Sequence, residues 1–237
     1  MDVQIDSQKV ADYYNKLSSI WPQNEPWYKH TQKEISRFIH EHPFEKNDYV
    51  LNAGAGENDY DIQGRIHYVD IAEKKIKDKP LFTVANIEKL PFENDLFTGV
   101  VCVGSVLNYC DAVAALSELS RVLCRSGKLI LEFESSYSYE YKGTPLYGVD
   151  ADIVTTTYYG QPHKIWVFSP AYIKRVLNQC NLKLLNEECF HIISALVFHL
   201  GKSETDSSRY TCFDAIAKRI PFVKRHGCNV LMECVKL

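Results

Sequence analysis

Two glycines directly after an apolar run are the residues of this sequence best suited to hold a ligand. The run YVLNA at 49–53 continues into Gly54 and Gly56. Glycines in this position allow a tight turn and let a ligand lie against bare backbone, as in nucleotide-binding loops. Two glycines also occur in purely structural turns, so this turn is informative only together with the side chains that come after it in the chain.

Polar side chains follow the next two apolar runs. Asp70 ends one of them, and its carboxylate can accept hydrogen bonds from both hydroxyls of a ribose, or it can cap a helix. Asn86 follows the next run and can bind the edge of an adenine, although an isolated Asn is more often a turn residue. Ile71 and Ile87 can pack on the two faces of such a ring. Three successive run ends with suitable groups favour a nucleoside site.

The order of elements around these residues predicts an α/β fold. Short apolar runs at 66–71, 81–85, 98–105 and 128–135 are separated by polar or helix-like stretches. Buried strands that alternate with helices are typical of an open parallel sheet with helices on both faces. The glycine turn, Asp70 and Asn86 then each follow a strand of this sheet.

Two longer helices and a final strand are predicted in the second half of the chain. Residues 111–127 predict a helix that Asp111 can cap and that Gly127 ends. Residues 169–181 predict another helix, which starts with a serine cap and a proline in the first position. Residues 182–200 read as a long final strand region.

The remaining segments predict a cap and an insertion. Residues 1–45 are expected to form a helical cap, because apolar and aromatic residues recur at helical spacing in 8–21 and 27–41. Tyrosines crowd residues 136–168, which we interpret as a lid or substrate insertion whose rings either stack on an acceptor or pack on the sheet edge. We expect residues 1–237 to form a single domain.

Composition argues against several functional classes. The 237 residues are 46% hydrophobic and 24% charged, which is typical of an ordinary globular protein. The formal net charge of −3 offers no general attraction to nucleic acid. A basic patch near the C-terminus remains, for which a solvated surface is the commoner explanation; it consists of Lys218, Arg219, Lys224, Arg225 and His226.

The cysteines indicate a reducing environment. The eight cysteines form no Cys-x-x-Cys pair, and no His, Asp or Glu cluster has ligand spacing, so we expect no metal. Several cysteines lie in apolar segments, and no signal-peptide pattern is present. No apolar run approaches the roughly 20 residues that span a bilayer. We therefore expect a cytoplasmic protein without a membrane span.

The segments VLNAGAG, YVDIAEKKI, ANIEKLPFENDLFTGVVCVGSVLNY and ALSELSRVLCRSGKLILEFES cover about residues 49–135. Together they resemble the class I S-adenosylmethionine-dependent methyltransferases, of the small-molecule kind similar to methyltransferase type 11. The resemblance implies a Rossmann-like, seven-stranded, mostly parallel sheet with an antiparallel last strand. It also implies S-adenosylmethionine as the cofactor and S-adenosylhomocysteine as the product.

The resemblance implies cofactor contacts at several strand ends. Asp70 would contact the ribose, and the methionine end would lie near Val103 and Ser105. The first helix closes over the cofactor in relatives, which brings Tyr13 or Tyr14 into consideration. The full set of expected contacts is Tyr14, Asn52, Ala53, Gly54, Gly56, Asp70, Ile71, Asn86, Ile87, Val103 and Ser105.

Four residues near the expected site differ from the usual motifs of this family, and a fifth affects which cofactor can bind. Asn52 replaces the usual acidic residue of the first motif, and Asn86 replaces a frequent Asp. Thr98 also replaces an Asp, and Asn58 stands where a third glycine often lies. These changes predict weaker cofactor binding. Glu57, beside the loop, is expected to repel the pyrophosphate of a nicotinamide cofactor, the nearest alternative ligand for such a fold.

Methyl transfer from a sulfonium is an in-line displacement, so an enclosed pocket that aligns the acceptor is the main requirement. A general base is optional, and the candidates are His163, Glu134, Tyr109 and Tyr147. The segment VGSVLNYCD lacks the Asp/Asn-Pro-Pro-aromatic motif of amino-directed nucleic-acid enzymes. This difference favours an oxygen or nitrogen atom of a small molecule as the acceptor.

Two other functions remain open. An RNA or protein methyltransferase would use the C-terminal basic patch, and its substrate binding would depend steeply on salt. A catalytically silent, methyltransferase-like binding subunit is suggested by the altered residues Asn52 and Asn86.

Overall fold

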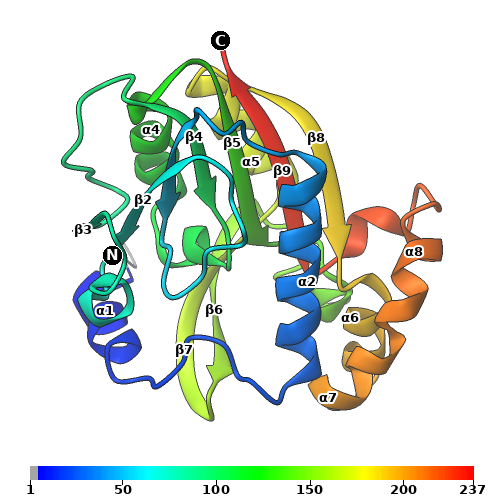
Figure 1. Cartoon of the computed structure of the whole chain (residues 1–237). Coiled ribbons are helices and arrows are strands. Elements are labelled where there is room, and N and C mark those ends of the chain that lie inside the picture. The colour runs from blue at the N-terminus through cyan, green and yellow to red at the C-terminus, as the bar shows by residue number, and fades with distance from the viewer. Residues whose placement is uncertain (1–4) are drawn as a thin grey trace.

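A seven-stranded sheet forms the centre of the computed structural model, which describes residues 5–237 (Figure 1). The strand order is β3-β2-β1-β4-β5-β9-β8; β3 to β5 run parallel, and β9 is antiparallel to both of its neighbours. The predicted Rossmann-like sheet with an antiparallel last strand is therefore confirmed. The strands are β1 (Tyr49–Ala53), β2 (Arg65–Asp70), β3 (Phe82–Val84), β4 (Phe97–Cys102), β5 (Leu123–Glu134), β8 (Leu182–Phe190) and β9 (Asn229–Lys236).

Helices cover both faces of this sheet, with α2 in front of it and α4 and α5 behind it in Figure 1. The α-helices are α1 (Ser7–Tyr14), α2 (Pro26–Glu41), α3 (Glu73–Ile76), α4 (Ala112–Val122), α5 (Pro170–Gln179), α6 (Ile192–His199), α7 (Glu204–Ser207) and α8 (Asp214–Ala217). Short 3₁₀ turns are η1 (Val106–Tyr109), η2 (Tyr139–Tyr141), η3 (Ser208–Phe213) and η4 (Lys224–His226).

The apolar residues of β4 divide the core into two layers. Val100 and Cys102 pack in the cluster that includes α4 and α5, whereas Val101 packs with Ile35 and Phe38 of α2. Successive side chains of a strand point to opposite faces, so a continuous apolar run is buried on both sides. The carboxyl end of β4 is thereby fixed between two helical layers.

The helix after β4 starts as predicted but ends earlier. Oδ1 of Asp111 accepts hydrogen bonds from the backbone N–H groups of Val113 and Ala114, at 2.8 and 3.0 Å. The prediction that Gly127 ends this helix is wrong, because α4 ends at Val122 and Gly127 lies within β5. A Cβ at Gly127 would overlap backbone and side-chain atoms of the preceding residues, so the glycine permits an irregularity of the strand instead.

The predicted strand at 182–200 is also only partly correct. The strand β8 ends at Phe190, and α6 follows after His191, whose φ is +53°. The Asp214 carboxylate caps this helix by accepting hydrogen bonds from the N–H groups of Ile192 and Ile193, at distances of 3.2 and 2.9 Å. The cap comes from a distant part of the chain, and the local apolar pattern therefore gave no sign of a helix start.

The predicted insertion contains a hairpin that contacts the N-terminal segment. Strands β6 (Ala151–Tyr158) and β7 (Gln161–Phe168) form a separate two-stranded antiparallel sheet. The Tyr158 hydroxyl donates to the carbonyl of Ile20, and the Tyr159 hydroxyl donates to the carbonyl of Ser19 at 2.9 Å. The Tyr13 hydroxyl donates to the carbonyl of Tyr158 at 3.0 Å. The hairpin and residues 13–20 thus form one connected layer.

The described part of the chain includes no helix that is both long and apolar enough to cross a membrane.

Removal of the Phe38 ring tests the packing of α2 on the sheet. Phe38 is 0% exposed, and Phe38→Ala is expected to lower the free energy of unfolding by about 3–5 kcal/mol because a cavity remains. Phe222 is 77% exposed, and Phe222→Ala is expected to change it by less than about 0.5 kcal/mol. Urea unfolding of both variants measures the difference; equal stabilities would contradict the assigned packing.

Candidate functional site

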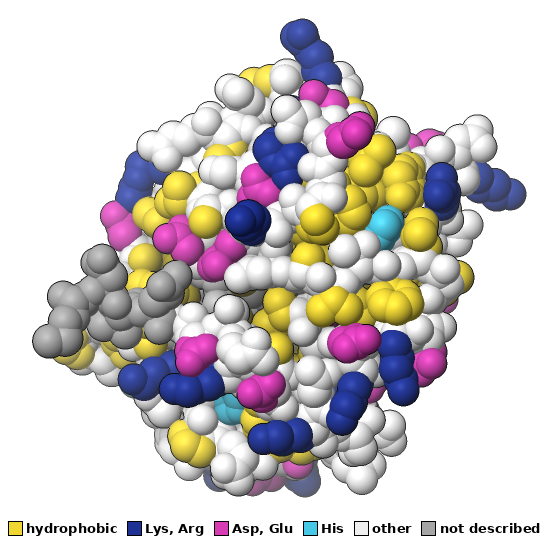
Figure 2. Space-filling view, turned by 90° about the vertical axis from the view of Figure 1, so that its left-hand side faces the viewer, with side chains coloured by type: hydrophobic (Ala, Val, Ile, Leu, Met, Phe, Trp, Pro, Cys, Tyr) yellow, Lys and Arg dark blue, Asp and Glu magenta, His cyan; other side chains and the backbone are white. Residues whose placement is uncertain are grey.

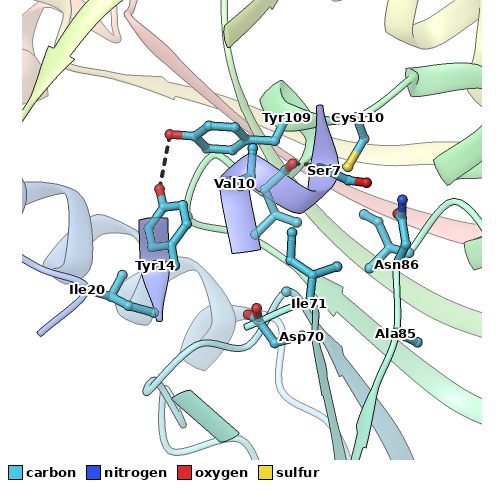
Figure 3. A pocket seen from close by; sticks show the side chains of 14 residues that line it. Ser7, Val10, Tyr14, Ile20, Asp70, Ile71, Ala85, Asn86, Tyr109 and Cys110 are labelled. Atoms are coloured by element: carbon cyan, nitrogen blue, oxygen red, sulfur yellow. Dashed lines mark hydrogen bonds between the residues drawn. The ribbon is translucent and has the colours of Figure 1, made fainter. Parts of the chain in front are cut away.

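A pocket lies at the carboxyl ends of β1, β2 and β4, where ligands bind in open α/β sheets. Its walls come from the glycine turn, the segments after β2 and β3, the turn η1 and helix α1 (Figure 3). The cavity has a volume of about 90 Å³. The expected residues that line it are Tyr14, Gly54, Asp70, Ile71, Asn86, Ile87 and Tyr109.

Both glycines of the turn after β1 are required by its geometry. Gly54 and Gly56 have φ values of +70° and +51°, in the left-handed region that favours glycine. A Cβ at Gly54 would overlap the side chain of Val106, and a Cβ at Gly56 would overlap Ile20. Two segments that are distant in sequence therefore approach the turn closely only because side chains are absent.

The Asp70 carboxylate joins the turn to the end of β2. One oxygen accepts a hydrogen bond from the N–H of Gly56, and the other accepts one from the N–H of Ala72, both at 2.8 Å. Burial raises the pKa of Asp70, while these N–H groups act in the opposite direction. A carboxylate has about four acceptor positions, so capacity remains on the side that lines the pocket.

Asn86 lies in the pocket wall with its amide oriented by a neighbour. Its Oδ1 accepts a hydrogen bond from the N–H of Glu88 at 2.9 Å, and its Nδ2 donates to Oε2 of Glu88 at 3.1 Å. Oε1 of Glu88 in turn accepts from the N–H of Asp111 at 2.6 Å. Glu88 was not anticipated from the sequence, since its role depends on the start of α4. Figure 3 shows Ile71 beside Asn86 on this side of the pocket.

Five expected contact residues do not line this pocket: Gly56, which lies in the turn itself, Ser105, which is described below, and three residues whose side chains lie elsewhere. The Asn52 side chain is 1% exposed and donates from Nδ2 to the carbonyl of Asn58 at 3.0 Å, so it supports the turn from inside. The Ala53 side chain is buried in the core. The Val103 side chain packs in the same layer as α2, because it alternates with Cys102. The side chains of Asn52, Ala53 and Val103 therefore do not line the pocket.

Helix α1 covers the pocket. Ser7, Val10 and Tyr14 line it, and the Tyr14 hydroxyl donates to the hydroxyl of Tyr109 at 3.0 Å (Figure 3). Tyr13 instead bonds to the hairpin. Tyr13 and Tyr14 were the candidates to close over the cofactor, and of the two Tyr14 lines the pocket.

Glu57 does not line the pocket and is paired. Its Oε1 lies 2.7 Å from Nζ of Lys75, and its Oε2 accepts from the N–H of Ile20 at 3.2 Å. The Lys75 ammonium is buried and also donates to the carbonyl of Leu17 at 2.6 Å. These bonds hold the segment after α1 against the glycine turn. The expected repulsion of a pyrophosphate by Glu57 is not supported by this geometry.

A second cavity adjoins the first and has a volume of about 70 Å³. Ser105 and Trp21 line it, whereas their neighbours Gly104 and Ile20 line the first cavity. Ser105 thus lies beside the second cavity and not in the first. Ser105 has a left-handed backbone with φ of +59°.

Carboxyl groups dominate the polar lining of this second cavity. Burial raises the pKa of Glu134 to about 8, and the neighbouring charge of Glu140 contributes to the same shift. Burial and the charge of Glu204 raise the pKa of Glu140 to about 7. All three residues line the cavity. Glu140 and Glu204 were missed by the sequence analysis, because nothing near them in the chain marks them as neighbours of Glu134.

The four candidate bases separate into two groups. Glu134 lines the second cavity and Tyr109 lines the first. His163 lines neither, and its ring packs against Tyr13 at a centroid distance of 4.1 Å. Tyr147 hydrogen-bonds to Nδ1 of His226 at 3.0 Å and also lies outside both cavities.

The C-terminal basic patch is partly neutralised. Nζ of Lys218 lies 2.9 Å from a carboxylate oxygen of Glu34 and 3.3 Å from one of Glu188, and His226 is buried.

On another face of the molecule, which carries α1 and α3, basic and acidic side chains are interspersed (Figure 2). Within residues 5–237 no group of three or more His, Cys, Asp or Glu is arranged to hold a metal ion.

Comparisons with known proteins agree with this arrangement. A family model described as a methyltransferase domain matches residues 53–131, which confirms the resemblance noted from the sequence. Two uncharacterized proteins of Methanocaldococcus jannaschii are each 30% identical, over 137 and 139 residues. These matches cover 54% and 52% of this chain and 53% and 60% of the relatives. The chain thus spans about half the length of the curated relatives it matches.

Solved structures share the fold at low sequence identity. A methyltransferase from Methanosarcina mazei has a TM-score of 0.54 and 14% identity, with coverage of 84% of this chain and 97% of that one. Geranyl diphosphate C-methyltransferase from Streptomyces coelicolor, solved with S-adenosyl-L-homocysteine, has a TM-score of 0.61, 14% identity and 98% coverage of both chains. The [4+2]-cyclase SpnF has a TM-score of 0.63 and 12% identity, with coverage of 100% and 98%. These likenesses show the fold, and the cyclase is named for a different reaction.

The close approach at Gly54 is tested against a matched glycine. Gly54→Ala and Gly143→Ala both place alanine in left-handed backbone, which costs about 1–2 kcal/mol. Only Gly54→Ala adds an overlap, with Val106, expected to cost about a further 1–3 kcal/mol, because a Cβ at Gly143 meets nothing within 4 Å. Chemical unfolding of both variants tests this; equal losses of stability would contradict the close approach.

The raised pKa of Glu134 predicts a pH-dependent stability. Its carboxyl has a pKa near 4.5 when unfolded and about 8 when folded, so the folded state binds the additional proton between these values. Stability from this group is full below the lower pKa and is lost as the pH rises through the upper one. As the pH rises from about 5 to about 8, the melting temperature of Glu134→Gln is expected to fall less than that of the parent protein.

Glu93→Gln, at an exposed position, is the control and should follow the parent's profile. Melting temperatures at several pH values decide the matter, and a Glu134→Gln profile as steep as the parent's would contradict the assignment.

Proposed function

We propose that this chain, which carries a methyltransferase domain at residues 53–131, transfers a methyl group from S-adenosylmethionine to a small molecule. The acceptor atom is an oxygen or a nitrogen, and S-adenosylhomocysteine is the second product. The observation that carries the proposal is the Asp70 carboxylate, which is held by two backbone N–H groups beside a glycine turn at the end of a neighbouring strand.

The residues of the pocket fit the proposed cofactor. Gly54 lines the pocket, and its bare backbone supports close approach of a ligand on that side of the turn. Asp70 would hold the ribose hydroxyls, and Ile71 and Ile87 would pack on the adenine beside Asn86. The methionine end would extend toward residues 104–106, where the two cavities meet.

We propose that the cover of the pocket moves, and the small volume of the cavity supports this. Sites for small molecules and cofactors measure roughly 300–1,000 Å³, and this pocket measures about 90 Å³. Helix α1 is short, and its Tyr14 side chain spans to Tyr109 through a single hydrogen bond. We propose that α1, within the cap of residues 1–45, opens for exchange of the cofactor. The insertion at 136–168 would act with it as a lid, all within one domain of residues 1–237.

The cofactor supplies an activated methyl group on a sulfonium. The chain's own part is to exclude water, to hold the acceptor atom in line with the carbon–sulfur bond, and to take a proton from the acceptor where one must leave. Glu134 is the best-placed proton acceptor of the four candidates, because it lines the cavity next to residues 104–106. Tyr109 is better suited to positioning, since its hydroxyl is engaged by Tyr14.

The two alternatives have less support. Lys218 of the C-terminal basic patch is already paired with Glu34 and Glu188, which weakens its attraction for the phosphates of an RNA substrate. A catalytically silent binding subunit was suggested by Asn52 and Asn86. Asn52 supports the turn by a hydrogen bond to Asn58, and this role is compatible with cofactor binding.

Calorimetric titration tests the cofactor site directly. The protein is expected to bind S-adenosylmethionine and S-adenosylhomocysteine, and Asp70→Asn is expected to weaken both by about 10- to 100-fold because charge-assisted hydrogen bonds to the ribose are lost. Asp78→Asn removes an exposed carboxylate that does not line the pocket and should bind both as tightly as the parent.

If the parent and Asp70→Asn bind both compounds with equal affinity, the assignment of Asp70 as the residue that holds the ribose is wrong. A folded parent protein that binds neither compound would contradict the proposed function and favour the silent subunit.

A further inference from the structure

The second cavity has an unusual concentration of buried acid. Glu134 ends β5, Glu140 lies in η2 and Glu204 begins α7, so three separate elements direct carboxyl groups toward one volume. Among the described residues that line this cavity, none is a lysine or an arginine. Burial, and after it the charges of neighbouring carboxyl groups, raises the pKa values of Glu134 and Glu140.

An independent feature of the same cavity also points to a polar ligand. Nε1 of Trp21 is buried and has no hydrogen-bond partner, and Trp21 lines the cavity. Buried N–H groups in folded proteins are nearly always paired, so an orphaned one at a cavity wall is suited to an oxygen of a bound molecule. Its volume of about 70 Å³ exceeds the roughly 10–15 Å³ that one water molecule requires.

Aromatic rings supply another part of the lining. Trp27 and Tyr28 line the cavity together with Trp21. Trp27 is held rigidly, because one face of its indole stacks on His191 at a centroid distance of 3.8 Å. Aromatic faces attract cations through their quadrupole, and carboxylates attract them by charge. The wall chemistry therefore favours a cation and disfavours an anion.

The segment at which the linings of the two cavities adjoin is held by a buried carboxyl group. The N–H groups of Gly104 and Ser105 both donate to Oε2 of Glu132, at 2.8 and 2.6 Å. Oε1 of Glu132 accepts from Nδ2 of Asn229 at 2.7 Å. This buried carboxyl group, bonded through both oxygens, holds residues 104–105 in place where the linings of the two cavities adjoin.

We propose that the second cavity binds the protonated amine of the acceptor substrate, and that this amine nitrogen is the atom that is methylated. The inference rests on the proposed function, since it names the acceptor class of that same site. An oxygen near the amine would receive the Trp21 N–H. Acceptors whose reacting end is a carboxylate or a phosphate are excluded by the same carboxyl groups.

The transfer step balances without a further reactant. The bound ammonium loses one proton to the Glu134 carboxylate, which frees the nitrogen lone pair. The new nitrogen–carbon bond forms as the carbon–sulfur bond breaks, and the electrons of that bond remain on sulfur as the neutral thioether of S-adenosylhomocysteine. The methylated amine leaves as a cation, and Glu134 releases its proton to solvent.

Binding of two probes of matched shape tests the inference. The protein is first saturated with S-adenosylhomocysteine and then titrated calorimetrically with benzylamine or with benzyl alcohol. We expect the charged amine to bind at least about tenfold more tightly than the neutral alcohol. Glu140→Gln and Glu204→Gln are each expected to weaken benzylamine by about tenfold while leaving benzyl alcohol and S-adenosylhomocysteine unchanged. Glu93→Gln, at an exposed position that does not line the cavity, should leave all three unchanged.

The possible failures are distinguishable. If S-adenosylhomocysteine binds but benzylamine is no tighter than benzyl alcohol, the amine inference is overturned and the proposed function stands. The same holds if both glutamine variants bind S-adenosylhomocysteine and benzylamine as tightly as the parent. If S-adenosylhomocysteine itself does not bind, both proposals are overturned.

Discussion

The two hydrogen bonds from the N–H groups of Gly56 and Ala72 to the Asp70 carboxylate are the constraint on which the site depends. They tie the turn after β1 to the end of β2. Charge-assisted bonds of this kind contribute roughly 1.5–3 kcal/mol each, and they oppose the burial that raises the pKa of Asp70. With the carboxylate fixed, the adjoining Ile71 and the glycine turn take up defined positions in the pocket.

The cover over this turn is built from parts that are distant in sequence. The buried ammonium of Lys75 and the carboxylate of Glu57 hold residues 17–20 against the turn, and the hairpin tyrosines bond to the same segment. Because Ile20 lines one cavity and Trp21 the other, the segment also divides the two. Motion of one short segment would therefore affect the proposed cofactor pocket and the proposed acceptor cavity together, which suits a reaction that must exclude water.

The sheet and the proposed cofactor pocket were largely predictable because their signals are local. Apolar runs that end in Gly54, Asp70 and Asn86 specify strand ends, and parallel strands bring those ends to one edge of the sheet. The side-chain direction of Val103 also follows from strand alternation, yet only once the register of β4 is known. The cap at Asp111 was predicted correctly for the same reason, because its side chain bonds to an N–H group in the first turn of the helix.

The remaining features arise from contacts between distant segments. The cap of α6 depends on Asp214, and the acid cavity requires Glu134, Glu140 and Glu204 to converge from three elements. The prediction that Gly127 ends a helix was wrong because glycine also occurs at irregularities within strands. No spacing in the sequence encodes such convergence, which tertiary packing alone determines.

A crystal structure of the protein with S-adenosylhomocysteine tests the central role of Asp70 most directly. The ribose hydroxyls should lie within hydrogen-bond distance of the Asp70 carboxylate, roughly 2.5–3.0 Å, with the adenine between Ile71 and Ile87 and α1 closed over it. Binding in another part of the molecule, or in this pocket with the ribose turned away from Asp70, would contradict the assignment.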